Sequence, residues 1–179
     1  AAYFSQKVLE NEGKSDSTAL NILGLARIRT ASSVGDFQAA GDYFQKSFDA
    51  SIEEVAAGLN LGYLKLQFGA AEAAMAIFSA VERRCGKCQE ALLGKAIALN
   101  RLGQYTEAKP LLETVLDKSP KDSQALYQMA LYYKNFEGNT DKTNDILSEL
   151  EAALQPNQLE LQEKVRLLLG KYELEHNAS

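Results

Sequence analysis

Apolar residues recur every three or four positions along most of this chain, a spacing that places them on one face of an α-helix. Leu92, Leu99 and Leu102 follow this spacing, and it resumes after Gly103. Good helix formers are abundant and runs of β-branched residues are few, so the pattern predicts an all-α protein. Helices are expected at Thr18–Ala31, Asp36–Ala50, Ile52–Phe68, Ala70–Arg84, Gln89–Leu102, Tyr105–Lys118, Ser123–Asn135, Asp141–Leu154 and Leu159–His176.

A fixed period of 34 residues underlies these helices. Gly35, Gly69 and Gly103 are 34 residues apart, and Gly138 continues the series within one residue. A repeat of this length predicts an array of similar units, each with two helices. Two further series keep the same step: Ala40 with Ala74 and Ala108, and Phe44 with Phe78 and Leu112.

The first unit is longer than the others. Leu23-Gly24 lies 38 residues before Leu61-Gly62, which indicates a four-residue insertion near Thr30–Ser33. We expect the extra residues to lengthen the connection between Arg29 and Val34, either as an additional helical turn or as a projecting loop.

Small residues have two expected roles in the repeat. The glycines of the 34-residue series fall between helices, where left-handed backbone angles end a helix abruptly. Ser51 and Glu54 have the spacing of a capping box, which would start the next helix. A second set of small residues lies within the predicted helices, where a large side chain would clash with a neighbouring helix: Gly24, Gly62, Ala96 and Ala130.

The third unit carries the most complete set of characteristic residues: Leu92, Ala96, Gly103-Gln104-Tyr105, Ala108, Leu112 and Pro120. On these residues the chain resembles the tetratricopeptide repeat family. The resemblance covers about residues 17–156 and implies an α-solenoid of stacked helical hairpins in a right-handed superhelix. It implies four hairpins over residues 17–156, preceded by the second helix of a partial repeat (1–16) and followed by a capping helix and tail (157–179).

Charge and composition narrow the function. The 179 residues carry a formal net charge of −5, which does not suit a binder of nucleic-acid phosphates. The apolar stretches are far shorter than the ~18 to 20 residues that span a bilayer. The one histidine, His176, cannot build a His-based triad, and neither GxxxxGK[ST] nor GxGxxG occurs. We therefore expect no enzyme activity, no cofactor and no metal site.

Cys85-Gly86-Lys87-Cys88 is the one motif with a chemistry of its own. A zinc site normally needs four ligands, and the sequence has no second cysteine or histidine pair. A thioredoxin-like role usually needs a βαβ context, whereas this motif falls between two predicted hairpins. A structural role is favoured, while a local disulfide, a redox function and an intermolecular metal site remain open.

The resemblance also implies where a partner would bind. Stacked hairpins form a concave groove that is lined by the first helix of each unit and that takes peptides or partner helices. Helical periodicity selects residues that combine amides with apolar and aromatic groups, a mixture that suits peptide contacts. The candidate partner-binding residues are Asn21, Leu25, Arg29, Asn60, Tyr63, Gln67, Asn100, Arg101, Gln124, Tyr127 and Gln128.

These features predict a non-enzymatic scaffold that binds a protein or peptide partner in the groove. Two alternatives are a bacterial envelope assembly lipoprotein, of pilus or outer-membrane machinery, and a regulatory or docking segment of a longer enzyme. A second copy of the chain is a further expected partner, because an incomplete N-terminal repeat would expose apolar surface. The compartment, cytoplasmic or envelope-associated, is left open by the sequence.

Overall fold

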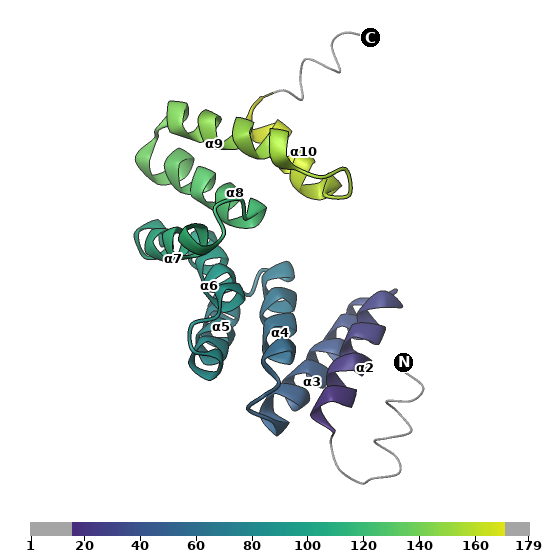
Figure 1. The fold of residues 1–179 in the computed structure, drawn as a ribbon. Helices are drawn as coiled ribbons and strands as arrows, with labels where there is room; N and C mark the ends of the chain where they lie inside the picture. Colours follow the sequence, from purple (N-terminus) through teal and green to yellow (C-terminus); the bar gives the residue numbers. More distant parts are fainter. Residues whose placement is uncertain (1–15, 171–179) are drawn as a thin grey trace. The chain divides into compact units, whose positions relative to one another are not determined.

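The computed structural model describes residues 16–170, which are helical throughout apart from short connections (Figure 1). The prediction of an all-α protein built from sequential helical hairpins is confirmed. The helices are α2 (Ser17–Arg29), α3 (Val34–Ala50), α4 (Val55–Gln67), α5 (Ala71–Cys85), α6 (Gln89–Arg101), α7 (Tyr105–Lys118), α8 (Ser123–Tyr132), the π-helical turn η1 (Tyr133–Glu137), α9 (Thr140–Ala153) and α10 (Leu159–Leu168).

The chain divides into two compact units, residues 1–98 and 99–179. Helix α6 is continuous across this boundary, so no linker marks it in the sequence. The expected half-repeat at residues 1–16 lies, except for Asp16, outside the described residues. His176 also lies outside the described residues. The helix expected at Leu159–His176 is shorter than predicted, because α10 ends at Leu168 and Gly170 has a left-handed φ of 69°.

In the first unit, glycines inside helices make room for the aromatic residues of the repeat. A Cβ atom at Gly24 of α2 would lie 2.5 Å from Cε1 of Phe44, and one at Gly62 of α4 would lie 2.7 Å from the ring of Phe78. Neither phenylalanine has any exposed surface. The expected role of these two small residues is therefore confirmed. A Cβ at Gly94 of α6 would also overlap the ring of Phe78.

The core of the second unit joins α8, α9 and α10. Leu147 and Leu150 of α9 are fully buried and cluster with Leu126 of α8. Leu161 and Val165 of α10 complete the same cluster. The last described helix thus buries one face against the preceding hairpin.

The four residues inserted in the first repeat mostly lengthen α3. Helix α2 ends at Arg29, the repeat equivalent of Gln67 at the end of α4, but α3 begins three residues earlier than α5 does in the repeat register. The insertion therefore adds almost one helical turn and lengthens the connection by one residue. Gly69 and Gly103 have the expected positive φ, of 77° and 74°. The expectation is wrong for Gly35, because the added turn places it inside α3.

The capping box lies at the start of α3 rather than at the start of α4. Ser33 accepts from the backbone N–H of Asp36, and the Asp36 carboxylate accepts from the N–H of Ser33. The box expected at Ser51 and Glu54 is wrong, since α4 begins at Val55 and no side chain caps it. Glu54 accepts instead from the hydroxyl of Thr18.

Candidate protein-binding surface

The first helices of the first two repeats, α2 and α4, place two candidate amides against each other. Nδ2 of Asn60 in α4 donates to Oδ1 of Asn21 in α2 at 3.0 Å, and both side chains are partly buried. This bond ties the two helices together and orients both amides. A partner would bind to the donors and acceptors of Asn21 and Asn60 that this bond does not use.

Apolar side chains lie exposed on the same two helices. Leu25 of α2 is 43% exposed and Tyr63 of α4 is 39% exposed. The Tyr63 ring meets Phe78 edge-to-face, with centroids 5.1 Å apart, so its position is held by the core beneath it. Arg29 and Gln67 are also exposed. Exposed apolar groups on a rigid base, with polar groups around them, suit a partner that brings its own apolar side chains.

Two candidate residues of the second unit are buried and bond each other. Asn100 of α6 and Gln128 of α8 are 6% and 7% exposed. Nδ2 of Asn100 donates to the backbone oxygen and to Oε1 of Gln128, at 3.1 and 3.0 Å. Oδ1 of Asn100 is buried without a hydrogen-bond partner in the described part of the chain. These amides join α6 to α8 and present almost no surface to a ligand.

The other candidates of the second unit differ in exposure. Arg101 and Gln124 are exposed, whereas Tyr127 is partly buried against the core cluster of α8 and α9. Burial raises the pKa of the Tyr127 hydroxyl, with a smaller opposing effect from Lys164. Tyr127 is uncharged at neutral pH, as an unburied tyrosine also is, so this shift does not change its charge there.

An open cavity of about 370 Å³ lies between α3 and the end of α4, and the sequence patterns did not point to it. Its apolar lining includes Phe37 and Phe68, whose rings meet edge-to-face at 5.4 Å, and Phe68 is 50% exposed. Asp42 and Lys65 add one charge of each sign. The exposed Phe68 directly before the turn glycine Gly69 was the one signal that could have drawn attention to this site.

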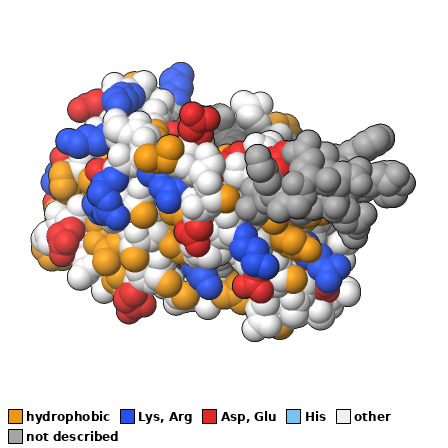
Figure 2. All heavy atoms as spheres, turned by 90° about the horizontal axis from the view of Figure 1, so that it is seen from below, with side chains coloured by type: hydrophobic (Ala, Val, Ile, Leu, Met, Phe, Trp, Pro, Cys, Tyr) orange, Lys and Arg blue, Asp and Glu red, His pale blue; other side chains and the backbone are white. Residues whose placement is uncertain are grey.

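Side chains that carry charge or could ligate a metal are spread along the described residues. On the face drawn in Figure 2, apolar side chains alternate with Lys and Arg and with Asp and Glu. The described residues contain no cluster of three or more His, Cys, Asp or Glu side chains that could hold a metal ion. None of the helices between residues 16 and 170 is long and apolar enough to cross a membrane.

The two cysteines form a disulfide across the turn that leads from α5 to α6. Gly86 and Lys87 between them both have left-handed backbone angles, with φ of 66° and 68°. Both cysteines also pack against the core cluster around Phe48 and Val81. Of the roles left open, the structure contains the local disulfide, and it closes the turn between two helices.

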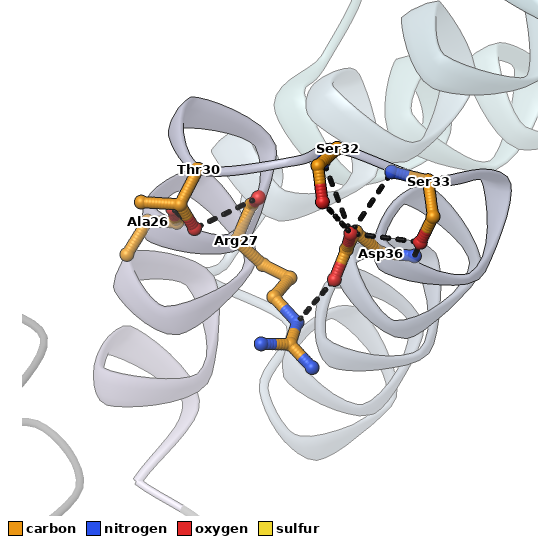
Figure 3. A network of polar contacts seen from close by, with 6 residues as sticks. All are labelled: Ala26, Arg27, Thr30, Ser32, Ser33 and Asp36. Carbon is orange, nitrogen blue, oxygen red and sulfur yellow. Dashed lines mark hydrogen bonds and ion pairs between the residues drawn. The ribbon is translucent and has the colours of Figure 1, made fainter.

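The turn from α2 to α3 is organised by one carboxylate (Figure 3). Asp36 Oδ2 accepts from the N–H groups of Ser32 and Ser33, at 3.1 and 3.0 Å, and from the Ser33 hydroxyl at 2.8 Å. Arg27 Nε lies 3.4 Å from Asp36 Oδ1. The bond from the Ser32 backbone, followed by the Ser33 hydroxyl, holds the Asp36 pKa below its ordinary value of 3.8.

This network predicts a pH-dependent contribution to stability. Because the folded-state pKa of Asp36 is lowered, the contribution is complete above the unfolded value and is lost as the pH falls through the folded value. Asp36→Asn is therefore expected to lower the thermal midpoint at pH 7, and the gap to wild type should narrow below about pH 4. Thermal unfolding followed by circular dichroism from pH 2.5 to 7 measures this. A gap that does not change with pH would contradict it.

Solved structures with similar folds define the class of protein. The chain is similar to YrrB, described as a TPR protein with an unusual peptide-binding site, at 20% identity and a TM-score of 0.69, covering 96% of this chain and 81% of that one. A tetratricopeptide repeat protein from Parabacteroides merdae matches at 19% identity and a TM-score of 0.74, covering 96% and 66%. MamA matches at 17% identity and a TM-score of 0.68, covering 91% of this chain and 87% of that one. The fold is that of a tetratricopeptide repeat protein.

A sequence model identifies the family more closely. The model of the coatomer epsilon subunit matches residues 7–166, which is most of the chain. The chain therefore belongs to the coatomer epsilon subunit family. Comparison with curated proteins finds no match.

Proposed function

We propose that this chain is a non-enzymatic subunit of a coatomer-type protein complex, and that it holds a peptide or helix of another subunit. The family match to a coatomer subunit supports the kind of assembly, and the peptide-binding site named for YrrB supports the kind of ligand. The observation that carries the proposal is the exposed face of α2 and α4, where Leu25 and Tyr63 stand beside the amide pair of Asn21 and Asn60.

The face suits an amphipathic partner. Two large apolar side chains, 43% and 39% exposed, provide contact area that would be buried on binding. Arg29 and Gln67 around them are exposed polar groups that can bond a partner's backbone or side chains. Asn100 and Gln128 are left out of the proposed contact surface, because their amides bond each other in the interior.

Affinity purification of a tagged chain from cells of its source, followed by mass spectrometry, tests this proposal. Leu25→Ser with Tyr63→Ser should lose the coat subunits that wild type retains. The matched control is Ile52→Ser with Leu159→Ser, since both residues are large, apolar and highly exposed, at 72% and 69%, but lie near connections outside this face. Circular dichroism must first show that both variants fold. Equal retention of the same subunits by all three proteins would exclude this face as the binding site.

A further inference from the structure

We propose that Ser32 is a phosphorylation site for a protein kinase that selects arginine on the N-terminal side of the acceptor. Arg29 and Arg27 precede Ser32 by three and five residues. Ser32 is the only serine or threonine in the 179-residue sequence with arginine at both positions. Kinases distinguish substrates partly by such charge patterns, since acidic groups beside the kinase cleft attract the arginines and repel acidic sequences.

The structure places this motif where an enzyme can reach it. Ser32 is exposed in the Thr30–Ser33 connection, which belongs to no helix (Figure 3). Arg27 and Arg29 are exposed in the last turn of α2. To lie extended in a kinase cleft, the last turn of α2 has to unwind. The bonds that end this helix, from Thr30 to the carbonyls of Ala26 and Arg27, are all 3.2 to 3.4 Å long. The terminal turn of a helix opens at a lower free-energy cost than its interior.

The Ser32 side chain is not needed to build the turn. Ser33 provides the cap of α3, and the Ser32 hydroxyl adds one contact of 3.4 Å to Asp36. The backbone N–H of Ser32, which holds Asp36 at 3.1 Å, is unaffected by chemistry at the hydroxyl.

The reaction needs ATP as its second substrate. Oγ of Ser32 attacks the γ-phosphorus, the bond from that phosphorus to the β,γ-bridging oxygen breaks, and ADP leaves. The hydroxyl proton passes to the catalytic base of the kinase. The product carries a phosphate of about −1.5 to −2 charge at pH 7.

A phosphate on Ser32 would act directly on the Asp36 network. Its oxygens would stand beside the Asp36 carboxylate, which is 3.4 Å from the unmodified hydroxyl, and like charges this close repel. Arg27, now paired with Asp36, would be drawn to the stronger anion. We expect the capping box to weaken and the thermal midpoint to fall by a few degrees, more at pH 8 than at pH 5, because the second phosphate pKa is about 6.

The test uses the full chain, magnesium ATP and the catalytic domain of protein kinase B as the probe kinase. Mass spectrometry is expected to locate one phosphate on Ser32 of the folded protein. Ser32→Ala should lose it, and Arg27→Gln with Arg29→Gln should be modified at least tenfold more slowly. Matched controls are Ser148→Ala, at another exposed serine, and Arg83→Gln, at another exposed arginine; both should be modified at the wild-type rate.

Three results would overturn the proposal. One is incorporation into Ser32→Ala at the wild-type rate, and another is a phosphate found on Thr30 or Ser33 instead. The third is a synthetic peptide of residues 24–36 that accepts phosphate while the folded chain does not. Circular dichroism of each variant before the assay ensures that altered rates do not come from unfolding.

Discussion

Replacing Gly94 by alanine is expected to lower the free energy of unfolding by about 3 kcal/mol, at the upper end of the range for overpacked cores. The new Cβ would overlap the ring of Phe78, which is fully buried. Movement of the ring is restricted, because Gly62 of α4 approaches it closely as well and Tyr63 packs on it. Urea unfolding followed by circular dichroism measures the change.

Gly35→Ala is the matched control for this substitution. It also adds one methyl group to a helical glycine of the first unit, but the nearest atom, Ser33 Oγ, would be 3.7 Å away. Stability should stay the same or rise by about 0.5 to 1 kcal/mol, because alanine favours the helix. Phe78→Leu combined with Gly94→Ala should cost less than the two changes added together, since the smaller side chain relieves the overlap. Equal losses for Gly35→Ala and Gly94→Ala would contradict the packing argument.

Arg84→Ala is expected to cost about 3 kcal/mol, because Arg84 of α5 secures the end of α3. Nη1 of Arg84 donates to the carbonyl oxygens of Phe48 and Ser51, at 2.5 and 3.1 Å. The guanidinium carbon lies 3.5 Å from the centroid of the Phe48 ring. Hydrogen bonds from a charged donor contribute about 1.5 to 3 kcal/mol, and a cation over an aromatic ring adds about 0.5 to 2.

The neighbouring arginine provides the control. Arg83 is exposed and bears the same charge at the same end of α5, so Arg83→Ala should change stability by less than about 0.5 kcal/mol. Arg84→Lys should recover only part of the loss, since lysine lacks the planar group that reaches two carbonyls while lying on a ring. If Arg83→Ala cost as much as Arg84→Ala, the helix dipole rather than these contacts would explain the effect.

The repeat period was sufficient to place the helices. Expected and observed ends of α2 to α9 differ by at most three residues, counting η1 as the continuation of α8. The period also assigned Gly24 and Gly62 their packing role, because these residues face the phenylalanine one helix further along the chain. Hydrophobic periodicity reports which face of a helix is buried, and hairpin stacking follows from it.

The periodicity could not separate groove positions from contacts between helices. Periodicity places Asn100 and Gln128 on the groove face of their helices, but polar residues at the edge of that face can also bond a neighbouring helix, as these two do between α6 and α8. The 34-residue period does not mark Gly94, because Gly94 does not share the repeat register of Gly62. The capping box at Ser33 depends on local backbone geometry that the inserted turn had changed.

The close packing of Gly62 and Gly94 against Phe78 limits how freely the repeats of this protein could be exchanged. Repeat arrays are often treated as modules whose order and number can be altered by design. Here the hairpin of α4 and α5 supplies Phe78 and Gly62, while the next helix must supply Gly94 at a position that the repeat does not specify. A consensus repeat placed after α5 would bring a larger residue to that position. Helices α4, α5 and α6 should therefore be transferred together in any chimera, although the 34-residue period assigns α6 to the next repeat.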